Sequence, residues 1–177
     1  MTAMSLHDLA VALDTVQRAA TAPQTGLPDG VFALVSQLTP LINVDLLIKD
    51  PQRGCLLTWR DDAHYGPGWH VPGGIIRFKE AWAQRVNAVA RQELDARVGF
   101  NPQPIAIHQL VNLSRDVRGH FISLLFDCQL ETPPRADWQA TDGAPPLNGQ
   151  WRWHARAPDN LISQHHIYLP FLHTDLP

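Results

Sequence analysis

The chain has 177 residues, of which 45% are apolar and 18% are charged, a composition typical of one globular domain rather than of a disordered segment. Fourteen basic and 17 acidic side chains give a formal net charge of -3, without a block of one sign. Bulk attraction to nucleic acid or anionic lipid is therefore disfavoured. The uncharged stretch 31–44 is too short and too polar to cross a bilayer. We expect neither a nucleic-acid nor a membrane partner.

The two cysteines and the N-terminus indicate the compartment. Cys55 and Cys128 lack a second Cys or His at zinc-ligand spacing, which predicts two reduced core thiols rather than a disulfide or a metal site. Asp8 lies where a signal peptide would be basic and then apolar. We therefore expect a cytoplasmic protein.

The first residues predict a helical extension. Ser5 and Asp8 form an approximate capping box, and the apolar residues that follow recur at helical spacing: Leu6, Leu9, Leu13 and Val16. Two Pro and two Gly make 21–30 a linker. The chain divides into this extension and linker, residues 1–27, and a domain, residues 28–177.

The next segments predict a short helix and a hairpin. Phe32, Val35 and Leu38 mark the helix, which Pro40 ends. Residues 41–49 form a largely apolar strand, 50–54 a turn and 55–60 a second strand.

One long helix is predicted in the middle of the chain. Residues 80–97 contain no Pro or Gly, and Gly99 is expected to end the helix. Trp82, Val86, Val89 and Glu93 fall on one face of it. A glutamate on an otherwise apolar face marks Glu93 as a candidate functional residue.

The remaining segments predict a second strand pair and a functional loop. The strands are 104–113 and 120–131, and the Pro-rich loop 132–149 is long enough to suggest a function. Residues 151–153 form a last strand and 158–163 a short helix. Strands before and after one long helix predict an α+β sandwich with a mixed sheet.

The glycine pair and the long helix resemble the box of the Nudix hydrolases, G-x5-E-x7-R-E-U-x-E-E-x-G-U, with U aliphatic. Gly74, Glu80 and Glu93 match it, whereas four positions depart from it: Ala88, Val89, Gln92 and Asp95. These losses resemble the GDP-mannose mannosyl hydrolase branch, whose box keeps a single metal-binding Glu at this position.

Further segments stand in the order of that branch: Phe32-Ala33, Leu38-Thr39-Pro40-Leu41, Asp45, Leu56-Leu57-x-x-Arg60, Trp69-x-Val71-Pro72-Gly73-Gly74, His120 and Arg152-Trp153. The resemblance covers about residues 30–170. It implies a Nudix-type α/β/α sandwich, one long catalytic helix and a homodimer.

A pyrophosphate-linked substrate brings clustered negative charge, so its cleavage needs a cation. Mg²⁺ takes oxygen ligands and needs only one or two carboxylates besides the substrate phosphates. Glu93 would supply the carboxylate and Gly73 a main-chain carbonyl, presented by a tight turn. The alternative for Glu93 is an ion pair with Arg97 at i+4. Glu80 lacks its usual Arg partner at Ala88 and is expected to place favourable charge at the helix N-terminus.

Arg60 and Asp45 are candidates for substrate contacts. The Arg60 guanidinium suits a leaving phosphate, as the resemblance implies, although it could instead be a solvated edge-strand Arg. Asp45 lies in an apolar strand, where an unpaired carboxylate is costly. Its partner could be a sugar hydroxyl, as the family implies, or Arg60.

The general base is the weakest part of the resemblance. Leu147 and Asn148 stand where the branch has a metal-binding Gln and a basic His, and an Asn cannot accept a proton usefully. His120, His70 and His154 are the substitutes, and His120 ranks first because it opens a strand and matches a family His. Ile75 and Ala88 replace two phosphate-binding arginines of the branch.

The resemblance implies a Mg²⁺-dependent hydrolase that releases the sugar and the nucleoside diphosphate from a GDP-mannose-like substrate. Glu93, Arg60, Asp45 and His120 would be its catalytic residues, and Gly73 and Glu93 its metal ligands. The alternative is a Nudix-fold module that binds a nucleotide or sugar nucleotide without efficient hydrolysis. Cleavage at phosphorus is less favoured, because Val89 and Gln92 remove the carboxylates of multi-metal sites.

Overall fold

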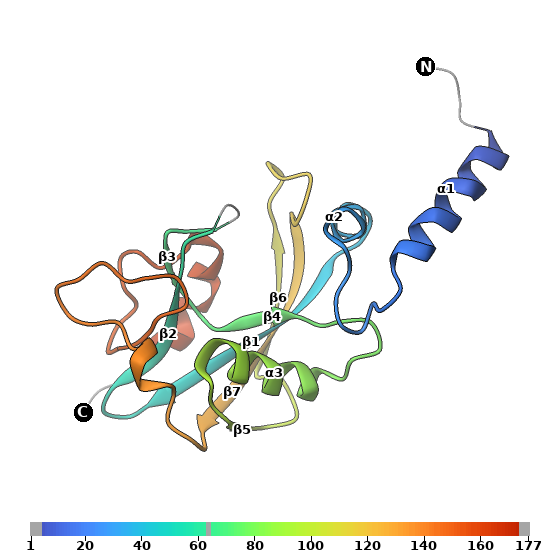
Figure 1. Ribbon diagram of the computed structural model, residues 1–177. Coiled ribbons are helices and arrows are strands. Elements are labelled where there is room, and N and C mark those ends of the chain that lie inside the picture. Colours follow the sequence, from blue (N-terminus) through green and yellow to red (C-terminus); the bar gives the residue numbers. More distant parts are fainter. Residues whose placement is uncertain (1–4, 63–64, 174–177) are drawn as a thin grey trace.

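The computed structural model describes residues 5–62 and 65–173 (Figure 1). The helices are α1 (Leu6–Ala19), α2 (Asp29–Leu38), α3 (Trp82–Leu94) and α4 (Leu169–Leu172), with 3-10 turns η1 (Ala136–Trp138) and η2 (Ser163–Tyr168). The strands are β1 (Leu41–Asp50), β2 (Gly54–Arg60), β3 (Gly68–His70), β4 (Gly73–Ile75), β5 (Val98–Phe100), β6 (Ala106–Val111), β7 (His120–Leu130) and β8 (Trp151–His154). Within the described part of the chain, no helix is long and apolar enough to cross a membrane.

The strands form one mixed sheet, in which β1 is central. Strands β3, β2, β1, β7 and β5 lie side by side in that order, while β4 also pairs with β1, β6 with β7 and β8 with β2. Strand β1 runs parallel to β7, with Leu41 opposite Phe121 and Ile48 opposite Cys128. It runs antiparallel to β2 and β4. This confirms the predicted mixed sheet.

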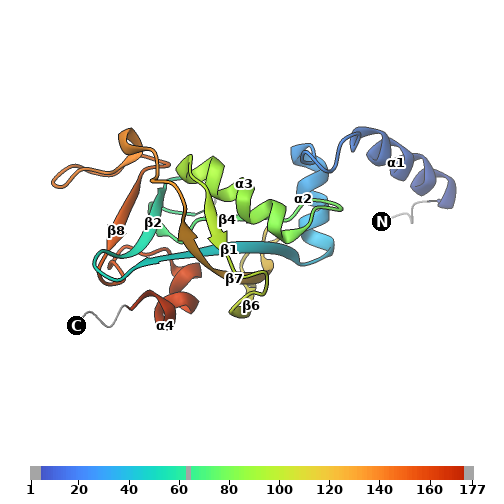
Figure 2. The same cartoon turned by 90° about the horizontal axis from the view of Figure 1, so that it is seen from below.

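Both faces of the sheet are covered, which explains the apolar sequence of β1. Val44, Leu46 and Ile48 share one buried cluster with helix α3, whereas Leu47 shares the other with Tyr168 and Leu172 of the C-terminal segment. Figure 2 shows α3 and α4 on opposite sides of the sheet. The predicted α+β sandwich is confirmed.

The N-terminal elements follow the sequence closely. The Ser5 hydroxyl accepts a hydrogen bond from the Asp8 N–H at 3.1 Å and caps helix α1, as predicted. None of the described residues of α1 is buried, and the helix projects away from the sheet (Figures 1 and 2). Helix α2 ends just before Pro40, as its sequence indicates.

Two predicted boundaries are wrong. Helix α3 ends at Leu94, because Asp95 adopts the left-handed conformation with φ 50° and stops it ahead of Gly99. Strand β5 follows, just beyond the predicted helix 80–97. Residues 158–163 form no regular helix, because the backbone of Leu161 and Ile162 pairs with Trp69 of β3. The helical turns begin at Ser163 instead.

His154, at the end of β8, makes stability depend on pH. Burial, together with the charge of Arg152, lowers its pKa from 6.5 to about 4. As the pH falls below 6.5 the unfolded chain therefore takes up a proton that the folded chain does not, and stability is lost down to about pH 4. We expect a His154→Gln variant to lose less melting temperature between pH 7 and pH 5 than the unmodified protein. Thermal denaturation at both values measures this, with exposed His7→Gln as control, and an equal loss in both variants would count against it.

Candidate active site

The Glu93 carboxylate is held by three donors from three strands. Its Oε1 accepts the Gly73 N–H at 3.1 Å, and its Oε2 accepts the Thr58 hydroxyl at 2.8 Å and lies 3.3 Å from Nε2 of His70. Burial opposes ionisation of this carboxyl, but the contacts with His70, Thr58 and Gly73 outweigh it and lower the pKa. Glu93 is therefore an anion at neutral pH, and its partner is not Arg97, which lies 3.7 Å from Glu131 instead.

Gly73 presents its backbone to the same carboxylate. It faces Asp45 in the antiparallel β1–β4 pair, whereas the neighbouring Leu46 N–H bonds the carbonyl of Pro72. Because hydrogen-bonded and non-bonded pairs alternate, both polar groups of Gly73 point away from β1. The N–H reaches Glu93, so the carbonyl opens on the same side of β4.

These groups fit a hard cation. A carboxylate has roughly four lone-pair sites, and the three donors on Glu93 leave one of them. Together with the Gly73 carbonyl this makes an all-oxygen donor set of the kind that Mg²⁺ uses with substrate phosphates and water. Among the described residues no three His, Cys, Asp or Glu side chains gather as a metal cluster.

His70 is brought against Glu93 by strand β3. Because the Thr58 hydroxyl donates to Glu93, Nε2 of His70, 3.2 Å from that hydroxyl, must carry the ring proton. Its Nδ1 is buried without a hydrogen-bond partner among the described residues. The sequence shows a histidine next to the glycine pair, but not its contact with a helix 23 residues later.

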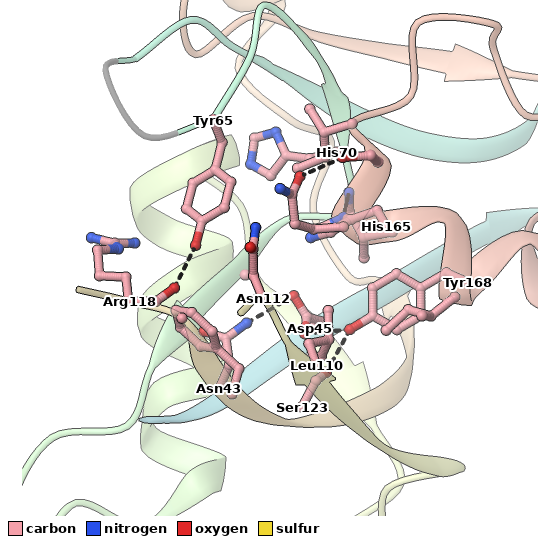
Figure 3. Close-up of a pocket in the computed structure, with 18 of the residues that line it drawn as sticks. Asn43, Asp45, Tyr65, His70, Leu110, Asn112, Arg118, Ser123, His165 and Tyr168 are labelled. Atoms are coloured by element: carbon pink, nitrogen blue, oxygen red, sulfur yellow. Dashed lines mark hydrogen bonds between the residues drawn. The ribbon is translucent and has the colours of Figure 1, made fainter. Parts of the chain in front are cut away.

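A cavity of about 730 Å³ opens beside this cluster (Figure 3). Asp45 lies at its floor with 1% exposure and accepts hydrogen bonds from Asn43 at 2.9 Å, Tyr168 at 2.7 Å and Ser123. Burial raises the pKa of this carboxyl, and the three donors offset only part of the rise. The protein partners of Asp45 are thus neutral donors, and Arg60 is not among them.

Arg60 lies at the mouth of the cavity. Its Nε donates to Asp62 at 2.8 Å, and its guanidinium stacks on Tyr65 at 5.1 Å from the ring centre. It lines both the main cavity and a second one of about 430 Å³ that contains Glu93. The Arg60 side chain is 29% exposed and contributes to both the cavity of Asp45 and that of Glu93.

The other base candidates lie further out. Nε2 of His120 lies 3.0 Å from the amide nitrogen of Gln109, and His120 is not among the residues that line either cavity. Asn148 lines the smaller cavity with Glu93, and its Oδ1 accepts the Asp61 N–H at 3.1 Å. Of the histidines proposed from the sequence, the structure brings His70 to Glu93.

Glu80 has the arginine partner that the sequence seemed to lack. Its Oε2 accepts from Arg85 Nε at 2.9 Å and from the Arg77 N–H at 2.9 Å. Arg85 is only 4% exposed. The ion pair therefore comes from the first turn of α3 instead of from the position of Ala88, and Glu80 anchors the loop before the helix.

The C-terminal segment contributes residues that sequence reasoning missed. Tyr168 donates to Asp45 across 123 residues of sequence, and Nδ1 of His165 accepts the Val71 N–H at 2.9 Å. Burial, with the charges of His70 and Arg60, holds the pKa of His165 well below its ordinary value. An apolar tail with scattered polar residues gives no signal of this role.

Gly73 leaves no room for a side chain. An added Cβ would overlap Oδ1 of Asp45 and lie 3.0 Å from the carbonyl oxygen of Val44. We expect Gly73→Ala to lower the free energy of unfolding by about 1–3 kcal/mol, or the melting temperature by about 2–12 °C, because β4 must shift. Gly30→Ala, where nothing lies within 4 Å, is the matched control. Equal melting temperatures for both variants would contradict the expectation.

Comparisons with known proteins agree with this architecture. The chain is 28% identical to a low-salt glycan biosynthesis protein of Haloferax volcanii. The matched stretch is 113 residues long and covers 62% of this chain and 71% of that protein. The MutT NUDIX hydrolase from Burkholderia pseudomallei superposes with a TM-score of 0.58 at 18% identity, over 75% of this chain and 97% of that one. The MutT protein from Methanosarcina mazei Go1 superposes with a TM-score of 0.57 at 15% identity, over 76% of this chain and 94% of that one. No protein-family model matches the sequence. The sheet, its central helix and these neighbours together show that the chain has the fold of the Nudix hydrolases.

Proposed function

We propose that the protein is a Mg²⁺-dependent hydrolase of the Nudix type that acts on a nucleoside diphosphate sugar similar to GDP-mannose. The observation that carries the proposal is the convergence of the ionised Glu93 carboxylate and the Gly73 backbone beside a cavity with cationic and hydroxyl-binding groups. The related protein named for glycan biosynthesis supports a sugar-containing substrate. The Nudix fold supports hydrolysis.

Each part of the substrate has a counterpart in this arrangement. Glu93 and Gly73 would hold Mg²⁺, which neutralises charge on the leaving diphosphate when it is bound. Arg60 would bind a diphosphate oxygen, and Asp45 would accept a hydrogen bond from a sugar hydroxyl on its remaining lone pair. Water would attack the anomeric carbon as the bond from that carbon to the diphosphate oxygen breaks, giving free sugar and the nucleoside diphosphate.

The proton of the attacking water needs an acceptor. His120 remains our proposal from the resemblance, and His70 is a second candidate because it lines the cavity and its Nδ1 has no hydrogen-bond partner among the described residues. His120→Gln decides for the first candidate: loss of most of the turnover supports His120 as the base, and undiminished turnover removes it. His70→Gln also removes a contact of the Glu93 carboxylate, so a loss of turnover in that variant alone does not identify the base.

Product analysis tests the reaction. Purified protein is incubated with Mg²⁺ and GDP-, UDP- and dTDP-linked sugars, and free sugar and nucleotide are quantified. Free sugar with nucleoside diphosphate supports attack at carbon. Sugar phosphate with nucleoside monophosphate would show attack at phosphorus, and turnover of no substrate would count against a hydrolase.

The second candidate function is a sugar-nucleotide binding module without efficient hydrolysis. It is favoured by the replacement of two phosphate-binding arginines by Ile75 and Ala88 and by Asn148 at the position of the basic histidine. Calorimetry distinguishes the two, because tight binding with intact ligand recovered afterwards supports the module.

We also propose a homodimer, which light scattering tests, and a cytoplasmic location, which the two free buried thiols support.

A further inference from the structure

The turn between β6 and β7 is a rigid platform at the cavity mouth. Asn112 donates its N–H to Gly119 at 2.7 Å and accepts the Arg115 N–H at 3.2 Å. The Asn112 side-chain oxygen also accepts from both the N–H and the hydroxyl of Ser114. A side chain at Gly119 would overlap the carbonyl oxygen of Arg115. These contacts fix the backbone of the turn that carries Arg115 and Arg118.

The backbone of Arg118 is held by contacts on both sides. It has φ 56°, a left-handed conformation that is uncommon for an arginine and persists only when the surroundings hold it. Its N–H donates to the Ser36 hydroxyl at 3.3 Å, and its carbonyl accepts the Tyr65 hydroxyl at 3.3 Å (Figure 3). Helix α2 and the loop before β3 thus hold this residue in place together.

Three guanidinium groups surround the Tyr65 ring. Those of Arg60, Arg115 and Arg118 lie 5.1, 4.5 and 5.6 Å from the ring centre, within the range of cation–π contacts. All three arginines line the main cavity, the one with Asp45 at its floor. They enter it from two segments that are distant in sequence, so no local motif could reveal the group.

The cluster gathers three cationic side chains at one cavity, and the Asp62 carboxylate pairs with Arg60. Nε of Arg118 is buried, and it has no hydrogen-bond partner among the described residues. A buried cationic donor without a partner is costly, and a polyanionic ligand with bidentate oxygens would satisfy it.

We propose that Arg115 and Arg118, together with Arg60, form the subsite for the diphosphate of the ligand. They would supply from the β6–β7 turn the positive charge that Ile75 and Ala88 no longer provide. The ligand then lies with its phosphates under the arginines and its uncharged, hydroxyl-bearing part toward Asp45. This assignment rests on the proposed function for the identity of the ligand, but the anion site can be measured without it.

Binding without metal tests the subsite. Calorimetry in EDTA measures the affinity of the full chain for inorganic pyrophosphate, for GDP and for guanosine. We expect Arg118→Gln to lower the affinity for pyrophosphate and for GDP at least tenfold, and the double variant Arg115→Gln/Arg118→Gln to lower both affinities further. Arg118→Lys should fall between, because it keeps the charge and loses the planar fork. Exposed Arg156→Gln should bind as the unmodified protein does, and guanosine should be unaffected throughout.

The results separate the subsite from the reaction. Unchanged pyrophosphate affinity in folded Arg115→Gln/Arg118→Gln overturns the subsite, even if sugar nucleotides are hydrolysed. Weakened affinity supports it, even if the unmodified protein hydrolyses none of them. If replacement of Arg118 prevents folding, the single variant Arg115→Gln decides, because the backbone of Arg115 is not in the left-handed conformation. Unchanged pyrophosphate affinity in that variant overturns the subsite, and a tenfold loss supports it.

Discussion

Glu93→Gln is expected to lower the turnover of a sugar nucleotide by about 100- to 1,000-fold or more, the scale of losing one preorganised electrostatic stabiliser. The substitution keeps the shape of the side chain but removes the negative charge that Gly73, Thr58 and His70 converge on. Without that charge, one of the two ligands proposed for Mg²⁺ is weakened. Initial rates of free-sugar release at saturating Mg²⁺ measure the effect.

The matched control for this substitution is Glu131→Gln. Glu131 is exposed, and its long contact with Arg97 at 3.7 Å contributes little. Its rate should equal that of the unmodified protein. The amide that replaces the Glu93 carboxylate has only one acceptor oxygen, so one of the donors around it loses its acceptor, which can lower stability. The melting temperature must therefore show that Glu93→Gln is folded. An undiminished rate in the folded variant would remove Glu93 from the mechanism.

Arg85→Met is expected to have the largest effect on stability. It leaves the Glu80 carboxylate, whose side chain is 15% exposed, without its cation, and removing one partner of a buried pair costs about 3–5 kcal/mol. In a chain of this size that corresponds to a fall in melting temperature of about 6–20 °C. Differential scanning calorimetry measures it.

A double variant shows whether the loss comes from the stranded charge. Glu80→Gln/Arg85→Met removes both charges and should recover most of the lost stability, because the net value of a buried pair is small. Arg91→Met, on the exposed side of the same helix, should change little. A double variant as unstable as Arg85→Met would mean that packing of the Arg85 stem against Gly74, and not charge, sets the loss.

The fold was predictable where one local signal dominates. The Ser5 cap, the proline after α2 and the largely apolar sequence of β1 each predict their element correctly. The end of α3 was not predictable, because Asp95 takes a left-handed conformation that the sequence pattern assigns to glycine. Residues 158–163 were misread because pairing with β3, a contact across some 90 residues, overrides a local helical preference.

The site was predictable only in part, for a similar reason. An acid on an apolar helix face marked Glu93 as a candidate functional residue, and the structure places its carboxylate 3.1 Å from the Gly73 N–H. The partners of Asp45 were not foreseen, because two of them, Ser123 and Tyr168, are 78 and 123 residues away in the chain. Periodicity reports which face of an element is buried, and it carries no information on which distant side chain completes a hydrogen bond.

The late position of Tyr168 has a consequence for biosynthesis. A nascent chain exposes β1 early, yet the Asp45 carboxylate gains its last donor only when the segment around Tyr168 has left the ribosome. Cys55 likewise finds its contact with the carbonyl of Leu172 only at that stage. Until then the cavity lacks one of its walls, so premature termination shortly before this segment would yield polypeptides that have most of the sheet and an incomplete cavity.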